Sequence, residues 1–125
     1  MDTIGWILLA LLAVQVVFQA KLALGAPLGH IAYGGRHKGA LPKNYRIVSA
    51  VAVLVYSFFM TIVVMASTAD NGVSSSSLIE IVLWIMAVFF GLGTIANAFS
   101  PSKPERWWAV YTLATLLCTL YLLQI

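Results

Sequence analysis

The chain alternates between long apolar stretches and short polar connections. Four apolar stretches cover residues 4–24, 47–67, 78–99 and 107–125. Each is close to the ~20 helical residues that cross a hydrocarbon layer of ~30 Å. Strands of a membrane barrel are about half as long and alternate in polarity, whereas these stretches are continuously apolar. The pattern therefore predicts an all-α fold, an integral membrane bundle of four transmembrane helices that forms one domain over residues 1–125.

The composition indicates lipid rather than water as the solvent. Of the 125 residues, 62% are hydrophobic and 9% are charged, whereas a soluble domain carries ~25% charged residues. We expect the first stretch to remain in the mature protein as a helix. It follows Met1-Asp2 rather than a positively charged start, and it is long for the apolar region of a signal peptide.

Among the connections and chain ends, only two connections hold basic residues, and this predicts the orientation. The connections hold Arg36, Lys38, Lys43 and Arg46, and then Lys103 and Arg106. The connection 68–77 and both chain ends have no Lys or Arg. Short loops rich in Lys and Arg stay cytoplasmic, so both termini are expected to face outside. A cysteine placed at Ser75 is then expected to react from outside, and one placed at Lys38 from the cytoplasm.

The first connection, residues 25–46, is unusually rich in glycine and also holds apolar and aromatic residues. Irregular backbone at membrane depth is tolerated where protein or a water-filled cavity surrounds it. We therefore expect part of this loop to lie against the bundle, with Pro27 ending or kinking the first helix. The spacings Ser77–Glu80 and Ser102–Glu105 predict capping boxes that open the last two helices.

Two segments of the chain support a resemblance. The strings Gly25-Ala-Pro-Leu-Gly-His30, Tyr33-Gly-Gly-Arg-His-Lys-Gly39 and Ala96-Asn-Ala-Phe-Ser-Pro-Ser-Lys-Pro-Glu-Arg106 resemble those of a group of small, uncharacterised bacterial four-helix integral membrane proteins. They cover the two basic connections and their flanks, about a third of the chain. The resemblance implies a bacterial cytoplasmic (inner) membrane and implies no mechanism.

Polar residues within apolar helices are the strongest indication of a site. Gln15 and Gln19 share a helix face because they are four residues apart. The antiparallel course of the helices brings Lys21 and Asn97 to a similar depth, near the first connection. The candidate ligand-binding residues are Gln15, Gln19, Lys21, His30, Tyr33, Arg36, Lys38 and Asn97. The alternative is that the amides only join helices by hydrogen bonds of ~0.6 kcal/mol, while Lys21 extends to the lipid headgroups.

The glycine-rich connection also allows an anion site. Glycines let successive N–H groups converge on one anion, and Arg36 and Lys38 would supply countercharge. The alternative is that these basic residues set the topology and attract anionic lipid headgroups.

Other chemistry is not indicated. His30 and His37 have no acidic or thiol partner nearby and fall short of the three or four ligands of a metal site, and Cys118 lies alone in an apolar stretch. No phosphate-binding GxxxxGK[ST] string occurs. We therefore expect no catalytic residues, no enzymatic activity, no metal, no cofactor and no nucleic-acid partner.

Two hypotheses for function follow. The first is a protein that binds, or binds and transports, a small molecule or anion at a cytoplasm-facing pocket. The second is an accessory or scaffold subunit that binds lipid or a larger membrane complex. Ala87, Gly91 and Gly93 allow close helix approach, either within the chain or across a homodimer, and a homodimer could enclose a transport path.

Overall fold

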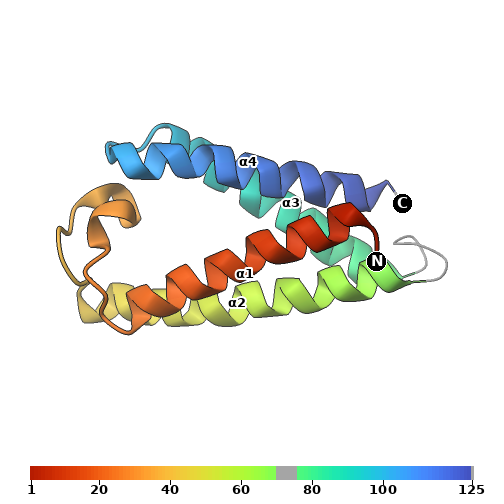
Figure 1. Ribbon diagram of the computed structural model, residues 1–125, viewed down its shortest axis with the longest axis horizontal. Coiled ribbons are helices and arrows are strands. Elements are labelled where there is room, and N and C mark those ends of the chain that lie inside the picture. The colour runs from red at the N-terminus through yellow and green to blue at the C-terminus, as the bar shows by residue number, and fades with distance from the viewer. Residues whose placement is uncertain (70–75, 125) are drawn as a thin grey trace.

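The computed structural model describes residues 1–69 and 76–124, which form a bundle of four long helices (Figure 1). The helices are α1 (Thr3–Ala23), α2 (Lys43–Thr68), α3 (Ser77–Ala98) and α4 (Lys103–Leu123), and two short 3-10 turns, η1 (Gly29–Ile31) and η2 (Tyr33–Gly35), lie between α1 and α2. Each long helix is long and apolar enough to cross a membrane. The predicted all-α membrane bundle is confirmed. Asp70, Ser75 and Ile125 lie outside the described residues.

Helices α2 and α4 each begin four residues before the predicted apolar stretch. Pro42 is the N-cap of α2, and Pro104 is the second residue of α4, a position near a helix start where proline is tolerated. The polar residues that follow each proline continue the helix. Apolar patterning marks the part of a helix that suits lipid and does not mark where its backbone hydrogen bonds start.

The two predicted capping boxes are wrong. The N-cap of α3 is Ser76, whose Oγ accepts a hydrogen bond from Ile79 N at 3.4 Å, so Glu80 lies one residue beyond the position that closes a box. At α4, Ser102 is the N-cap but makes no capping bond. Its Oγ donates to the backbone carbonyl of His30 at 2.7 Å. The Glu105 carboxylate accepts a hydrogen bond from Gly34 N of the same connection at 3.2 Å. Both polar groups that would form the second box therefore contact the α1–α2 connection instead.

Helix α1 ends at Ala23, four residues before Pro27. The prediction that this proline ends or kinks the helix is therefore wrong. The N–H of Ala26 donates to the carbonyl of Lys21, and the N–H of Gly25 donates to that of Leu22. This pair of bonds is a Schellman motif. It needs a left-handed residue at Gly25, whose φ is +94°, and a glycine adopts that conformation without a steric penalty.

The bundle is built from two antiparallel helix pairs. Helix α1 packs mainly on α2 and α3 mainly on α4, with less contact between the pairs. The two chain ends lie together at one end of the bundle, opposite the α1–α2 connection (Figure 1). A Cβ added to Gly91 or Gly93 would lie 4.0 Å from Leu116 or 3.9 Å from Thr112. These glycines therefore face α4 within the chain, at a distance that a methyl group would fit.

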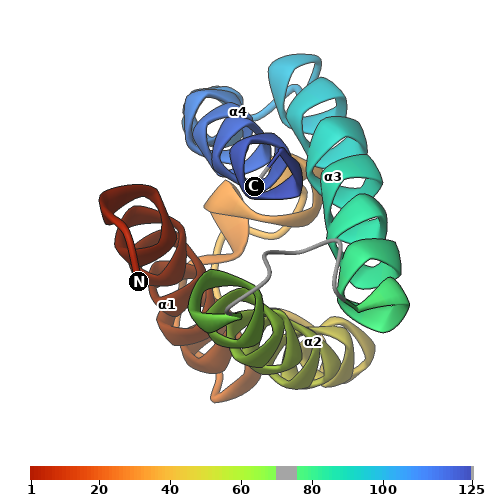
Figure 2. The same cartoon turned by 90° about the vertical axis from the view of Figure 1, so that its right-hand side faces the viewer.

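The apolar core fills the half of the bundle nearest the termini. It includes Leu12, Phe59, Val63 and Leu83. At the other end the α1–α2 connection lies between the helices (Figure 2), and its Ala32 and Leu41 form a second apolar cluster with Leu22 of α1. The prediction that part of this connection lies against the bundle is confirmed.

Apolar side chains also cover the outside of the helices. Leu54 is 71% exposed and Trp107 is 69% exposed. A water-soluble protein rarely exposes apolar side chains over so much of its surface, so this outer face suits lipid.

Candidate functional site

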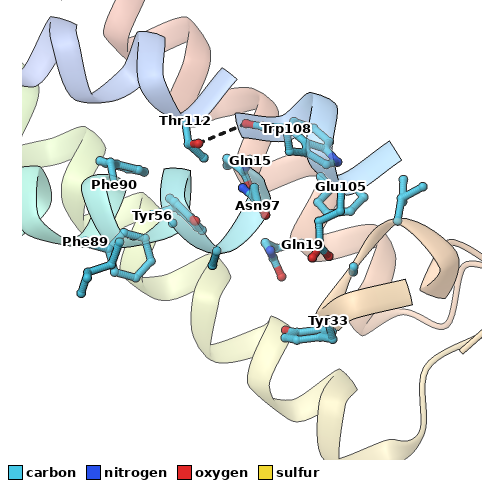
Figure 3. A pocket seen from close by; sticks show the side chains of 16 residues that line it. Gln15, Gln19, Tyr33, Tyr56, Phe89, Phe90, Asn97, Glu105, Trp108 and Thr112 are labelled. Carbon is cyan, nitrogen blue, oxygen red and sulfur yellow. Dashed lines mark hydrogen bonds between the residues drawn. The ribbon is translucent and has the colours of Figure 1, made fainter. Parts of the chain in front are cut away.

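A cavity of about 460 Å³ lies between the apolar core and the α1–α2 connection. All four long helices and the middle of the η1–η2 segment, residues 31–33, contribute to its wall (Figure 3). The lining residues are Gln15, Phe18, Gln19, Ile31, Ala32, Tyr33, Tyr56, Phe89, Phe90, Leu92, Gly93, Ala96, Asn97, Glu105, Trp108 and Thr112. Its size is within the ~300–1,000 Å³ of ordinary small-molecule sites.

Four of the eight candidate site residues line this cavity. Gln15 and Gln19 reach it from one face of α1, Asn97 from the last turns of α3, and Tyr33 from the connection. In Figure 3 these side chains come from α1, α3 and the connection and lie around one space. The spacing of four residues on α1 and the antiparallel course of α1 and α3 account for this convergence.

The other four candidates do not line the cavity. Lys21 is exposed and lines a separate apolar groove together with Val14 and Val17 of α1 and Trp108 of α4. It follows Gln19 by two residues, which is about 200° around a helix, so the two side chains leave α1 on different faces. His30, Arg36 and Lys38 are exposed.

The N–H groups of the glycine-rich connection are already used within the protein. Gly29 N donates to Gly39 O at 3.0 Å, and Gly35 N donates to Ala32 O at 2.9 Å. Gly34 N donates to Glu105 Oε2 at 3.2 Å. The position at which the anion hypothesis would put a ligand is therefore next to a carboxylate of the protein itself.

Sequence reasoning missed the residues that α4 contributes. Glu105, Trp108 and Thr112 line the cavity, and their spacing of three and four residues puts them on one helix face. That spacing was a usable signal. It was obscured because Glu105 also fits the capping-box pattern and Trp108 fits an interfacial aromatic.

Aromatic rings make up much of the remaining wall. Tyr56 of α2 packs against Phe90 of α3 with ring centroids 6.2 Å apart, and Phe18 of α1 packs against Trp108 with centroids 5.2 Å apart. In the sequence these residues look like ordinary core or lipid-facing residues, because aromatic side chains occur all along the apolar stretches.

Within residues 1–69 and 76–124, the side-chain amides of Gln15, Gln19 and Asn97 make no hydrogen bond to another helix. The Oε1 atom of Gln19 is buried and has no hydrogen-bond partner among the described residues. A bond that does join helices is the one from Thr94 Oγ1 to Thr112 Oγ1, at 3.0 Å between α3 and α4. A buried acceptor without a donor is costly, and a ligand or water in the cavity can supply that donor.

Tyr33 is held in an unusual conformation at the cavity wall. Its φ is +48°, a left-handed value that is uncommon for a residue with a side chain. Its hydroxyl is hydrogen-bonded to the buried Ser49 Oγ at 2.8 Å, and its ring packs on Tyr45 with centroids 5.1 Å apart. Strain of this kind persists where surrounding contacts determine the conformation, and it concentrates at functional sites.

No cluster of three or more His, Cys, Asp or Glu side chains suited to a metal ion occurs within residues 1–69 and 76–124. The cavity instead combines amides, hydroxyls, aromatic rings and one carboxylate.

The chain matches no protein-family model, no curated protein and no solved structure. The resemblance of its two basic connections to small bacterial membrane proteins stays a prediction.

Proposed function

We propose that this protein binds a small organic molecule in the cavity between its two helix pairs. The observation that carries the proposal is the buried Oε1 of Gln19, at a cavity of about 460 Å³, for which the described part of the chain supplies no hydrogen-bond donor. Polar groups inside an apolar bundle are expensive unless they are paired or serve a ligand. Here the amides of α1 and α3 face a space that a ligand can fill.

We further propose that the cavity lies toward the cytoplasmic side of a bacterial inner membrane, with both termini outside. Support comes from where the basic residues fall. The α1–α2 connection, the end of α1 and the starts of α2 and α4 lie at the same end of the bundle (Figure 1). Together these segments hold all seven Lys and Arg residues. Anionic lipid headgroups would contact the exposed members of this set, such as Lys21 beside its apolar groove.

Transport is a narrower proposal than binding. In this conformation the core residues Tyr56 and Phe90 line the cavity toward the termini, and residues 31–33 of the α1–α2 connection line it at the other end. A transported molecule would therefore need a second conformation or a second copy of the chain to complete its path.

The test is whether the protein retains a discrete small molecule when it is purified. Native mass spectrometry of the protein from mild detergent is expected to show one adduct on the wild type. Asn97→Leu and Gln19→Leu are each expected to remove it, with helical content unchanged. The matched control is Thr61→Val, which makes a similar polar-to-apolar change at an exposed residue of α2 outside the cavity.

Retention of the same adduct by both cavity variants would overturn the proposal. An adduct consisting of phospholipid alone, equal in all four proteins, would favour the accessory or scaffold function instead.

A further inference from the structure

The cavity wall carries one formal charge, and that charge is negative. Glu105 is the sole Asp, Glu, Lys, Arg or His among the described residues that line it. The chain as a whole has a net charge of +3, so a negative cavity does not follow from composition. It follows from where the basic side chains point.

The nearby basic side chains are directed elsewhere. Arg106 Nη1 donates to the backbone carbonyl of Ser100 at 2.9 Å, and Arg46 Nε donates to the carbonyl of Ala23 at 3.0 Å. Both cations are thus used to close helix ends or turns. Lys103 is exposed and lies on a different face of α4, since it is two residues from Glu105.

Glu105 itself is only partly compensated. Its side chain is half-buried. Among residues 1–69 and 76–124, one hydrogen-bond donor reaches its carboxylate, the Gly34 N–H at 3.2 Å. No salt bridge joins it to a described basic residue. A carboxylate can accept several hydrogen bonds, so Glu105 keeps capacity for a further donor.

The other chemistry of the wall also suits a cationic donor. Gln19 Oε1 is a buried acceptor that needs an N–H or O–H. The rings of Phe18 and Trp108 line the same cavity, and the faces of aromatic rings attract cations. An inorganic divalent ion is a poor fit, because the described residues hold no group of three metal-ligating carboxylate, imidazole or thiol side chains.

We infer that the ligand is an organic monocation, an alkyl- or arylalkylammonium whose charged nitrogen pairs with Glu105 and donates to Gln19 Oε1. Its apolar part lies against the aromatic wall formed by Phe18, Tyr56 and Phe90. This inference rests on the proposed function and gives the cavity a ligand class. It replaces the anion of the sequence hypothesis with a ligand of the opposite charge.

The chain offers a fluorescent reporter at the cavity. Trp108 lines it, whereas Trp6, Trp84 and Trp107 are 61%, 52% and 69% exposed and lie outside it. A full-length protein with these three exposed tryptophans changed to phenylalanine keeps Trp108 as its single indole. Binding is then followed by Trp108 fluorescence during titration in lipid nanodiscs.

Three probes of nearly equal size and one bulkier quaternary ammonium ion separate the effect of charge from that of shape. They are 2-phenylethylammonium, its N,N,N-trimethyl derivative, the neutral 2-phenylethanol and the anion phenylacetate. We expect 2-phenylethylammonium to bind at least about tenfold more tightly than 2-phenylethanol, because a hydrogen bond between charged groups is stronger than one to a neutral hydroxyl. Phenylacetate is expected to bind least tightly, because its charge repels Glu105. The trimethyl derivative lacks N–H donors and is expected to be weaker than the primary ammonium ion.

Glu105→Gln is expected to lower affinity for 2-phenylethylammonium to the level of 2-phenylethanol and to leave affinity for 2-phenylethanol within about twofold. The glutamine keeps an acceptor for Gly34 N, so the loop contact is preserved. The matched control is Glu80→Gln, which removes the same charge from an exposed residue in the first turn of α3 and is expected to change neither affinity.

Two results overturn the inference, and they differ in what they say of the proposed function. Saturable binding in which the cation has no advantage over the alcohol, or in which Glu105→Gln leaves that advantage intact, refutes the cationic ligand while small-molecule binding stands. No saturable response of Trp108 to any of the four probes refutes both.

Discussion

The backbone N–H of Gly34 and the carboxylate of Glu105 meet at 3.2 Å, although they are 71 residues apart in the chain. The bond joins the strained turn of the connection to the first turn of α4. The bond from Ser102 Oγ to His30 O, at 2.7 Å, joins the same two segments. Together these two hydrogen bonds hold the connection against α4 at one side of the cavity. Their contribution can be measured directly.

Removing the carboxylate should loosen this contact. In Glu105→Ala the N–H of Gly34 loses its acceptor, and a hydrogen bond to a charged group contributes about 1.5 kcal/mol. Amide hydrogen exchange at Gly34 and Gly35 should then be roughly tenfold faster. Glu105→Gln retains an acceptor and should show exchange close to the wild type. Unchanged protection in Glu105→Ala would show that the bond does not hold the connection in place.

The Tyr33 hydroxyl should stabilise the fold through Ser49. Ser49 is fully buried, so Tyr33→Phe leaves its Oγ without the partner at 2.8 Å and should reduce the free energy of unfolding by about 1 kcal/mol. In the double variant Tyr33→Phe/Ser49→Ala the loss should be smaller than the sum of the single losses. Reversible unfolding in mixed micelles measures the cycle. Strict additivity would mean that the two hydroxyls are not coupled.

Gly29 should not tolerate a side chain. A Cβ there would lie 2.5 Å from the carbonyl oxygen of His37 and 2.6 Å from that of Gly39, and both are backbone atoms that move only if the loop moves. We expect Gly29→Ala to reduce the free energy of unfolding by about 2 kcal/mol. Gly39→Ala is the matched control, because a Cβ at Gly39 meets nothing within 4 Å. Equal melting temperatures for the two variants would contradict this account of the loop.

Orientation in the membrane can be measured on cysteine variants. The native Cys118 is first changed to alanine. A single cysteine at the exposed Lys38 should react with an impermeant maleimide only after the cytoplasmic face is opened, because basic connections stay cytoplasmic. A cysteine at Ser75, or at the exposed Ser77 that begins α3, should react in intact cells. The reverse pattern would place the cavity on the outer side.

The four helices and the convergence of polar residues between them could be predicted from the sequence. Length and continuous apolarity specify a spanning helix, because lipid leaves the backbone few alternatives. Gln15 and Gln19 could be placed on one face from their spacing alone. The first residues of the helices were harder to predict from the sequence. Ser102 and Glu105 satisfy the capping pattern, yet the long-range contacts with His30 and Gly34 take both side chains.

The sign of the charge at the cavity was the part that the sequence did not reveal. Arg36 and Lys38 are close in sequence to Tyr33, which suggests a basic site. In the structure the side chain that reaches the cavity with a charge is Glu105, from a distant helix. Such a juxtaposition depends on how the loop inserts between the helices, and local spacing contains no information about it.

The division of the bundle into two helix pairs has a mechanical consequence. Each pair is a tightly packed body, and few contacts join one body to the other. The bonds from Gly34 to Glu105 and from Ser102 to His30 act as a clasp between them at the looped end. Separating the bodies there breaks this clasp and no helix. The contacts that resist opening at this end are therefore two hydrogen bonds and the packing of the Phe18 ring of α1 against Trp108 of α4.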